Sequence, residues 1–135
     1  MVIDTSALVA IALHEASRDS LMAAIRAAGT RTVSSVSLLE AGMVLRARSG
    51  QPGVQKLYDF LEELSIGTAV FDGTQAKAAV AAFARFGKGM GHRAQLNFGD
   101  CAVYALAALR GEPLLATGHD FAATDLTVVV PTSAT

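Results

Sequence analysis

The chain has 135 residues, 52% of them hydrophobic, so it can bury one substantial core and is expected to form a single domain over residues 1–135. Its 11 basic and 12 acidic side chains leave a net charge of −1, which excludes a protein that binds polyanions through overall positive charge. The single cysteine, Cys101, excludes an internal disulfide bond.

Targeting signals are not expected. Asp4 interrupts the apolar run at the N-terminus before it reaches the length of a secretory signal. No apolar run approaches the about 18 residues that a membrane-spanning helix needs. We therefore expect a soluble, cytoplasmic protein that makes no contact with a membrane.

The first half of the chain is expected to alternate between strands and helices. A short apolar run predicts a strand that ends at Asp4, and alanine-rich helices follow it. Two further helices are expected on either side of a break at Ser49-Gly50. The expected elements are strand 1–3, helices 6–13 and 15–28, strand 32–35, and helices 37–48 and 54–64.

The second half continues this alternation and contains one long glycine-rich, polar loop. The expected elements are strand 67–71, helix 74–86, loop 87–99, helix 100–110, strands 113–117 and 126–130, and a loose end at 131–135. Alternation of this kind favours an α/β fold in which a small, mostly parallel sheet of four or five strands carries helices on both faces.

Four acidic residues fall where such a fold would bring them together. Ligands of open α/β sheets bind beyond the carboxyl ends of the strands. Asp4 ends the first strand, Glu40 lies in the helix after the second, Asp100 opens the helix after the glycine-rich loop, and Asp120 follows the strand PLLAT.

Each of these acids also has a local interpretation. Asp4 could cap the next helix, and Asp100 could complement a helix dipole. Glu40 completes the capping-box pattern S-x-x-E with Ser37, and Asp120 could begin a turn. Taken singly, the local role fits Glu40 and Asp120 better, whereas both roles stay open for Asp4 and Asp100.

Taken together, the acids predict a metal site. Carboxylates that lie close together at the carboxyl end of a sheet repel each other unless a cation binds between them. Mg²⁺ and Mn²⁺ prefer carboxylate oxygens as ligands. One or two such ions can promote hydrolysis of a phosphodiester. Nearby hydroxyl groups, those of Thr5, Ser6 and Thr117, could orient the carboxylates from a second sphere.

Four segments carry a resemblance to a known family: MVIDTSALVA, SLLEAGMVL, LNFGDCAVYALA and PLLATGHDFAATDL. They resemble PIN-domain ribonucleases and, more closely, the VapC toxins of prokaryotic toxin–antitoxin pairs. The similarity runs from Met1 to about Val130. It implies a PIN-like fold and an endoribonuclease that depends on Mg²⁺ or Mn²⁺.

The resemblance also implies which residues act. The family's first aspartate matches Asp4 in VIDTS, and its helix glutamate matches Glu40 in LLEAG. Its third acid matches Asp100 in FGDC and its fourth matches Asp120 in GHDF, with Asp125 as a competitor for the fourth position. The implied reaction is hydrolysis of RNA by a metal-activated water, which inhibits translation or growth. A VapB-type antitoxin as partner and a homodimer are implied as well.

Positive charge gathers around the glycine-rich loop, where Lys88 and Arg93 are candidate RNA contacts. The sequence GKG within this loop lacks the rest of a nucleotide-binding phosphate loop, so that interpretation is rejected.

Two other classes remain as alternatives. A phospho-accepting receiver domain is also a small α/β protein with clustered acids, but it would need an acid pair after strand one and a lysine after the last strand of the sheet. This chain has only Asp4 at the first place and no lysine after Lys88. A catalytically silent PIN-fold binding module would have lost acids, and all four are present. The scattered histidines share no motif, and Cys101 is better explained by packing than as a nucleophile.

Overall fold

The computed structural model describes residues 1–129 and residue 131, and in them five short strands form one parallel sheet. The order across the sheet is β3-β2-β1-β4-β5, so the N-terminal strand lies at the centre. The strands are β1 Val2–Ile3, β2 Thr32–Ser34, β3 Gly67–Ala69, β4 Leu114–Leu115 and β5 Val128–Val129.

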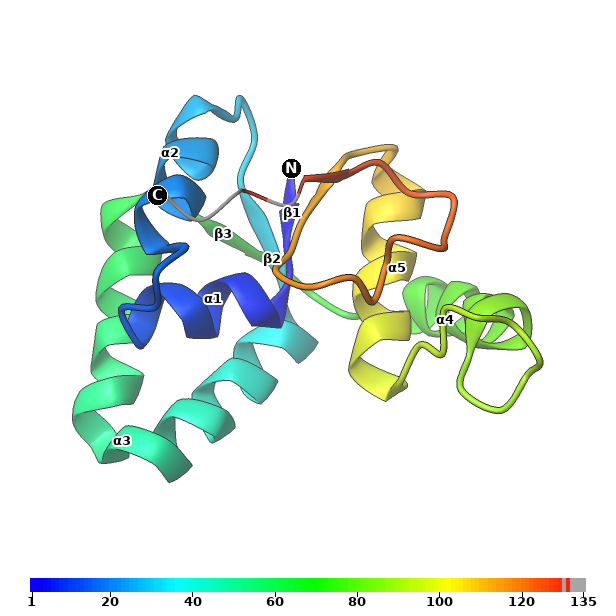
Figure 1. The fold of residues 1–135 in the computed structure, drawn as a ribbon, viewed down its shortest axis with the longest axis horizontal. Coiled ribbons are helices and arrows are strands. Elements are labelled where there is room, and N and C mark those ends of the chain that lie inside the picture. The colour runs from blue at the N-terminus through cyan, green and yellow to red at the C-terminus, as the bar shows by residue number, and fades with distance from the viewer. Residues whose placement is uncertain (130, 132–135) are drawn as a thin grey trace.

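Helices cover both faces of this sheet. Figure 1 shows the first three helices on one side of the strands and the last two on the other. The helices are α1 Thr5–Ala12, α2 Arg18–Ala27, α3 Ser35–Glu63, α4 Gly73–Phe86 and α5 Phe98–Arg110. The expected α/β fold, with a parallel sheet flanked on both faces, is therefore confirmed.

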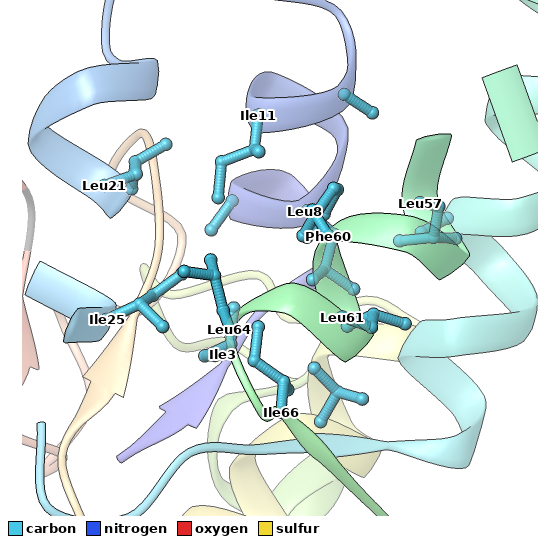
Figure 2. Close-up of a cluster of buried hydrophobic side chains, with 14 of the residues drawn as sticks. Ile3, Leu8, Ile11, Leu21, Ile25, Leu57, Phe60, Leu61, Leu64 and Ile66 are labelled. Atoms are coloured by element: carbon cyan, nitrogen blue, oxygen red, sulfur yellow. The ribbon is translucent and has the colours of Figure 1, made fainter. Parts of the chain in front are cut away.

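Alternation along the strands divides the core into two clusters. Ile3 and Leu115 pack with α1, α2 and α3, as the close-up in Figure 2 shows for Ile3. Their neighbours Val2 and Leu114 point to the opposite face and pack with α4 and α5. Successive side chains of a strand point to opposite faces, so a strand buried on both must be apolar throughout.

The long helix α3 is bent in its middle. Gly50 adopts a φ of 65° and a ψ of −163° inside the helix, and Pro52 follows it. Glycine tolerates this backbone, and the proline cannot supply the amide that would continue the helix. The break predicted at Ser49-Gly50 is thus a kink whose two arms enclose the angle visible in Figure 1.

Several boundaries differ from the expected ones. The strands are shorter, and helix α5 begins at Phe98 rather than at residue 100. A strand ends where its parallel partners stop offering hydrogen bonds, which local composition does not reveal. Val130, which was expected to end the last strand, and residues 132–135 of the expected loose end lie outside the described residues.

Among the described residues, none of the helices has both the length and the apolar character that crossing a bilayer requires.

Candidate active site

Asp4 sits at the end of β1 and serves as the N-cap of α1. Its Oδ2 accepts hydrogen bonds from the Ser6 amide at 3.0 Å and from the Ser6 hydroxyl at 2.6 Å. The side chain is buried, and burial raises the pKa of Asp4 against the effect of the Ser6 bonds, with a further rise from the charge of Glu40. Asp4 therefore caps α1, as the local interpretation predicted, and also lies within electrostatic reach of Glu40.

The two hydroxyl residues after Asp4 behave differently. Ser6 Oγ, which donates to Asp4, also accepts the Thr117 amide at 3.0 Å, so it joins β1 to the segment after β4. Thr5 Oγ1 is buried and has no hydrogen-bond partner among the described residues. A buried polar atom without a partner is costly, so Thr5 is a group that a bound ligand could satisfy.

Asp100 lies in the first turn of α5 and closes a capping box with Asn97. The Asp100 amide donates to Asn97 Oδ1 at 2.9 Å, and the Asn97 amide donates to Asp100 Oδ2 at 3.0 Å. Burial raises the pKa of Asp100 to about 6 against the Asn97 bond, and the charges of Asp4, Asp120 and Glu40 raise it further. The other three predicted acids are thus close enough to Asp100 for their charges to act on its carboxylate.

Glu40 lies against the same helix as Asp100. A Cβ atom added to Gly99 would come 3.0 Å from both Oε1 and Oε2 of Glu40, so the glycine makes room for this carboxylate. The capping box that the sequence suggested for Ser37 and Glu40 is wrong. Ser34 caps α3 by accepting the Val36 amide at 3.1 Å, which places Ser37 inside the helix, where its buried hydroxyl finds no partner in the described part of the chain.

Asp120 and Asp125 lie on the same connection but face different neighbours. Asp120 is exposed, and its charge contributes to the raised pKa of Asp100. Asp125 accepts a hydrogen bond from the Tyr104 hydroxyl and lies 3.6 Å from Arg85. The structure therefore associates Asp120, and not Asp125, with the other acids.

Figure 1 shows that α1, α3 and α5 begin at the carboxyl end of the sheet. Asp4, Glu40 and Asp100 come from the starts of these helices, and the charge of Asp120 also acts on Asp100. We call this group of four carboxylates the acidic pocket. None of Asp4, Glu40, Asp100 and Asp120 takes part in an ion pair within the part of the chain that the structure describes. In that same part, no three acidic, histidine or cysteine side chains are already drawn together as metal ligands. Carboxylates without a cation repel each other, so separated oxygens are expected here.

The donor set fits a hard divalent cation. It consists of carboxylate oxygens, with the unpartnered Thr5 hydroxyl beside Asp4 and a glycine that admits Glu40. Neither histidine nor thiolate is among these groups. Cys101 follows Asp100, and burial, together with the charge of Asp100, raises the pKa of its thiol, which disfavours the nucleophilic thiolate.

The raised pKa of Asp100 predicts how the metal-free protein responds to pH. The folded state holds the proton up to about pH 6, whereas the unfolded state loses it near pH 4. Protonation of Asp100 therefore contributes fully to the free energy of unfolding below about pH 4, and this contribution is lost as the pH rises to about 6. Because Asp100 is partly exposed and solvent screens its charge, we expect the free energy of unfolding to fall by about 1 kcal/mol over this range.

Denaturant unfolding in chelator at pH 4.5 and pH 7 measures this effect. The Asp100→Asn variant should gain stability over the parent at pH 7 and lose that advantage at pH 4.5. Glu62→Gln, which removes an exposed acid on α3, serves as the control. An advantage of Asp100→Asn that is equal at both pH values would contradict the prediction.

The two candidate RNA contacts, Lys88 and Arg93, are both exposed on the connection between α4 and α5. This connection is anchored rather than free, because Gly87 and Leu96 form a parallel bridge and Leu96 is fully buried. Arg85, three residues before Lys88, has other contacts: it lies 3.6 Å from Asp125, and its guanidinium lies 4.5 Å from the centroid of the Phe86 ring.

Sequence reasoning missed Asn97 and Gly99, the two residues that place Asp100 and Glu40. The pattern N-x-x-D over residues 97–100 could have indicated a capping box. Nothing local could have indicated that Gly99 faces Glu40, because these residues lie on helices far apart in the sequence.

Comparisons with known proteins find a matching family model and similar relatives. The PIN domain family model matches residues 1–126. A relative named "Ribonuclease VapC" from Mycolicibacterium smegmatis is 46% identical over 129 residues, which cover 96% of this chain and 99% of the relative.

Solved structures show the same fold. Mycobacterium tuberculosis VapC20, described as a sarcin–ricin loop cleaving toxin, aligns with a TM-score of 0.78 at 17% identity, covering 96% of this chain and 98% of that one. VapBC2 of Rickettsia felis, bound to a DNA fragment from its promoter, aligns with a TM-score of 0.77 at 15% identity, covering 97% and 98%. At such identities these structures support the fold alone.

Proposed function

The chain belongs to the PIN-domain family and, within it, to the VapC ribonuclease toxins, and from this premise we propose that it hydrolyses RNA with the help of Mg²⁺ or Mn²⁺ held at the acidic pocket. The observation that carries the proposal is the convergence of Asp4, Glu40 and Asp120 on Asp100. The two alternatives, a receiver-like signalling domain and a silent binding module, are not favoured, because the match to ribonuclease relatives covers nearly the whole chain.

Each acid would contribute to the metal site in its own way. Asp4 is held by Ser6 at the end of the central strand, and Asp100 is held by the capping box of α5. Glu40 can lie next to α5 because Gly99 has no side chain. Asp120 lies on the connection between β4 and β5, which has no regular secondary structure. A bound divalent ion supplies positive charge for a phosphate and lowers the pKa of a water molecule.

The hydroxyl groups would support these ligands. Ser6 fixes Asp4 and ties it to the backbone of Thr117, which keeps the segment that leads to Asp120 close to the central strand. Thr5 brings an unpartnered oxygen next to Asp4. For Thr117 the contact is made by the amide, so its side chain stays a predicted second-sphere group.

The direct test is incubation of the purified, antitoxin-free protein with total cellular RNA. Cleavage in Mg²⁺ or Mn²⁺, its absence in chelator and a defined set of cut ends would support the proposal. Cleavage that is unchanged in chelator would overturn the metal assignment, and absence of cleavage with either ion would overturn the ribonuclease assignment.

Lys88 and Arg93 are proposed to hold RNA phosphates. The double variant Lys88→Ala/Arg93→Ala should weaken RNA binding more at low than at high salt, and lower the salt slope by about 0.7 for each phosphate that is no longer neutralised. Filter binding of RNA across a salt series measures this slope. Arg48→Ala/Lys56→Ala, on the exposed surface of α3, is the matched control. A decrease in affinity that is independent of salt would point to misfolding instead.

A VapB-type antitoxin is proposed as the partner, since one solved neighbour is a VapBC complex. The groove inside the bend of α3 fits this role. It measures about 910 Å³ and is lined by residues that include Leu39, Met43 and Tyr58, which are exposed. Glu40 is not among the residues that line the groove, but it directly follows Leu39, so the groove adjoins the part of α3 that carries this acid.

The variant Met43→Glu is expected to weaken antitoxin binding by about tenfold to a hundredfold, because it removes an apolar side chain from the groove and buries a charge there. RNA cleavage by the free toxin should persist. Calorimetric titration with the antitoxin measures the affinity, and Leu109→Glu, at an exposed apolar position on α5, is the control. Equal decreases in affinity for both variants would contradict a specific role for the groove.

A homodimer and a cytoplasmic location stay predictions. An apolar hollow of about 350 Å³ between α4 and α5, with Val80, Phe83 and Phe98 exposed at its edge, is the surface that best supports self-association. Sedimentation of the antitoxin-free protein would measure its oligomeric state.

A further inference from the structure

Asp120 is the only one of the four acids of the pocket that neither lies in a helix nor caps one. It lies on the connection between β4 and β5, residues 116–127, which has no regular secondary structure. An acid on such a segment needs other contacts to hold it in place, because the backbone forms no ladder of its own there.

The connection is tied down on both sides of Asp120. On the N-terminal side, the Thr117 amide donates to Ser6 Oγ, the same atom that donates to Asp4. On the C-terminal side, Phe121 is only 2% exposed in the core next to α5. The Thr124 hydroxyl then donates to the Phe121 carbonyl at 2.7 Å and closes a short turn.

Beyond that turn, Asp125 is bound by side chains from two helices. The Tyr104 hydroxyl of α5 donates to Asp125 Oδ1, and Arg85 of α4 lies 3.6 Å from Asp125 Oδ2. Tyr104 is buried, and burial together with the bond to Asp125 raises the pKa of its hydroxyl to about 12. The Tyr104 bond in turn lowers the pKa of Asp125, so donor and acceptor keep these roles at neutral pH.

Tyr104 lies on the same helix as Asp100, so its bond to Asp125 links the connection to that helix. Tyr104 follows Asp100 by four residues on α5, and residues so spaced lie on the same side of a helix. Helix α5 therefore carries Asp100 and, through Tyr104, also binds Asp125, which lies five residues after Asp120. The spacing between the two acids then depends on the Tyr104–Asp125 contact.

We propose that Tyr104 and Asp125 are positioning residues, which hold the connection so that Asp120 completes the cation site with Asp100. The inference rests on the proposed function. It also assigns Asp125 a role other than metal ligand. Both carboxylate oxygens of Asp125 already have partners, and its charge is not among those that raise the pKa of Asp100.

The test is the affinity of the full chain for Mn²⁺, measured by calorimetry and by water-proton relaxation. Tyr104→Phe removes one oxygen and keeps the ring in the core. It should raise the Mn²⁺ dissociation constant about three- to tenfold, which is smaller than the about 10- to 100-fold effect of outer-sphere partners of metal ligands, because Tyr104 acts on the site only through the connection. Thr68→Val, which removes an exposed hydroxyl group on β3, is the control and should bind Mn²⁺ as the parent does.

Kinetics separate positioning from general loss of structure. Tyr104→Phe should raise the Mn²⁺ concentration needed for half-maximal cleavage and leave the KM for RNA unchanged. Asp125→Ala, at an exposed position, should have the same effect, and the double variant should be no worse than either single one. Additive effects, or a much larger effect of Asp125→Asn than of Tyr104→Phe, would instead make Asp125 a ligand and overturn the inference.

The remaining outcomes distinguish this inference from its premise. If the parent binds Mn²⁺ and cleaves RNA but Tyr104→Phe and Asp125→Ala bind Mn²⁺ as well as the parent does, only the positioning role is overturned. If the parent itself binds no Mn²⁺, the proposed metal-dependent function is overturned and the inference falls with it.

Discussion

Asp100→Asn is expected to reduce RNA cleavage by about a hundredfold or more while the fold survives, since even outer-sphere partners of metal ligands contribute about 10- to 100-fold. Asparagine has nearly the shape of aspartate, and its Oδ1 can still accept the Asn97 amide that closes the capping box. What the variant lacks is the negative charge that a divalent ion requires. Asp4→Asn should act in the same way, because asparagine is also a favoured N-cap.

Cleavage of total RNA in Mg²⁺ or Mn²⁺ measures this decrease, and thermal unfolding in chelator reports on the fold. Asp72→Asn is the matched control, since Asp72 also caps a helix, accepting the Gln75 amide at 2.9 Å, but lies outside the acidic pocket. Equal cleavage by Asp100→Asn and the parent would remove Asp100 from the site. A lower melting temperature of Asp100→Asn in chelator would contradict the electrostatic account of the pocket.

Gly99→Ala is expected to weaken Mn²⁺ binding and cleavage by about tenfold, without reducing stability. The added methyl group would stand 3.0 Å from both carboxylate oxygens of Glu40, so this carboxylate must shift by a few tenths of an ångström from the position it holds beside α5. Glu40 is exposed and can do so at little cost, whereas alanine is a better helix former than glycine by up to about 1 kcal/mol. Stability and activity should therefore change in opposite directions.

Mn²⁺ titration together with denaturant unfolding in chelator distinguishes the two effects. Gly73→Ala is the control, because Gly73 also lies in the first turn of a helix and nothing lies within 4 Å of its added Cβ. If Gly99→Ala bound Mn²⁺ as the parent does, the contact between Gly99 and Glu40 would have no role in the metal site.

Local composition predicted the elements of this fold well. Helix propensity, glycine breaks and short apolar runs placed every strand and helix that the structure describes, with errors of a few residues at the ends. The break at Ser49-Gly50 was also visible, because a glycine followed by a proline has a strong local effect on the backbone. Whether the two arms form one kinked helix or two separate ones depends on packing around the bend.

The capping box at Ser37 and Glu40 shows how a local pattern misleads. The spacing S-x-x-E was present, but Ser34 satisfies the helix start three residues earlier, where β2 ends. Register in the sheet decided this, since pairing of β2 with β3 extends through Ser34. Because Glu40 does not cap α3, its carboxylate can lie against Gly99 of α5.

The sequence alone determined that acids would follow strands and begin helices, and it carried the family resemblance that the match over residues 1–126 confirms. It could do so because caps, breaks and strand ends depend on neighbours within a few residues. Only the tertiary structure decided that Gly99 admits Glu40, that Ser6 bridges Asp4 and Thr117, and that Tyr104 holds Asp125. Those contacts join segments that are distant in the chain, and packing of the helices on the sheet brings them within reach of one another.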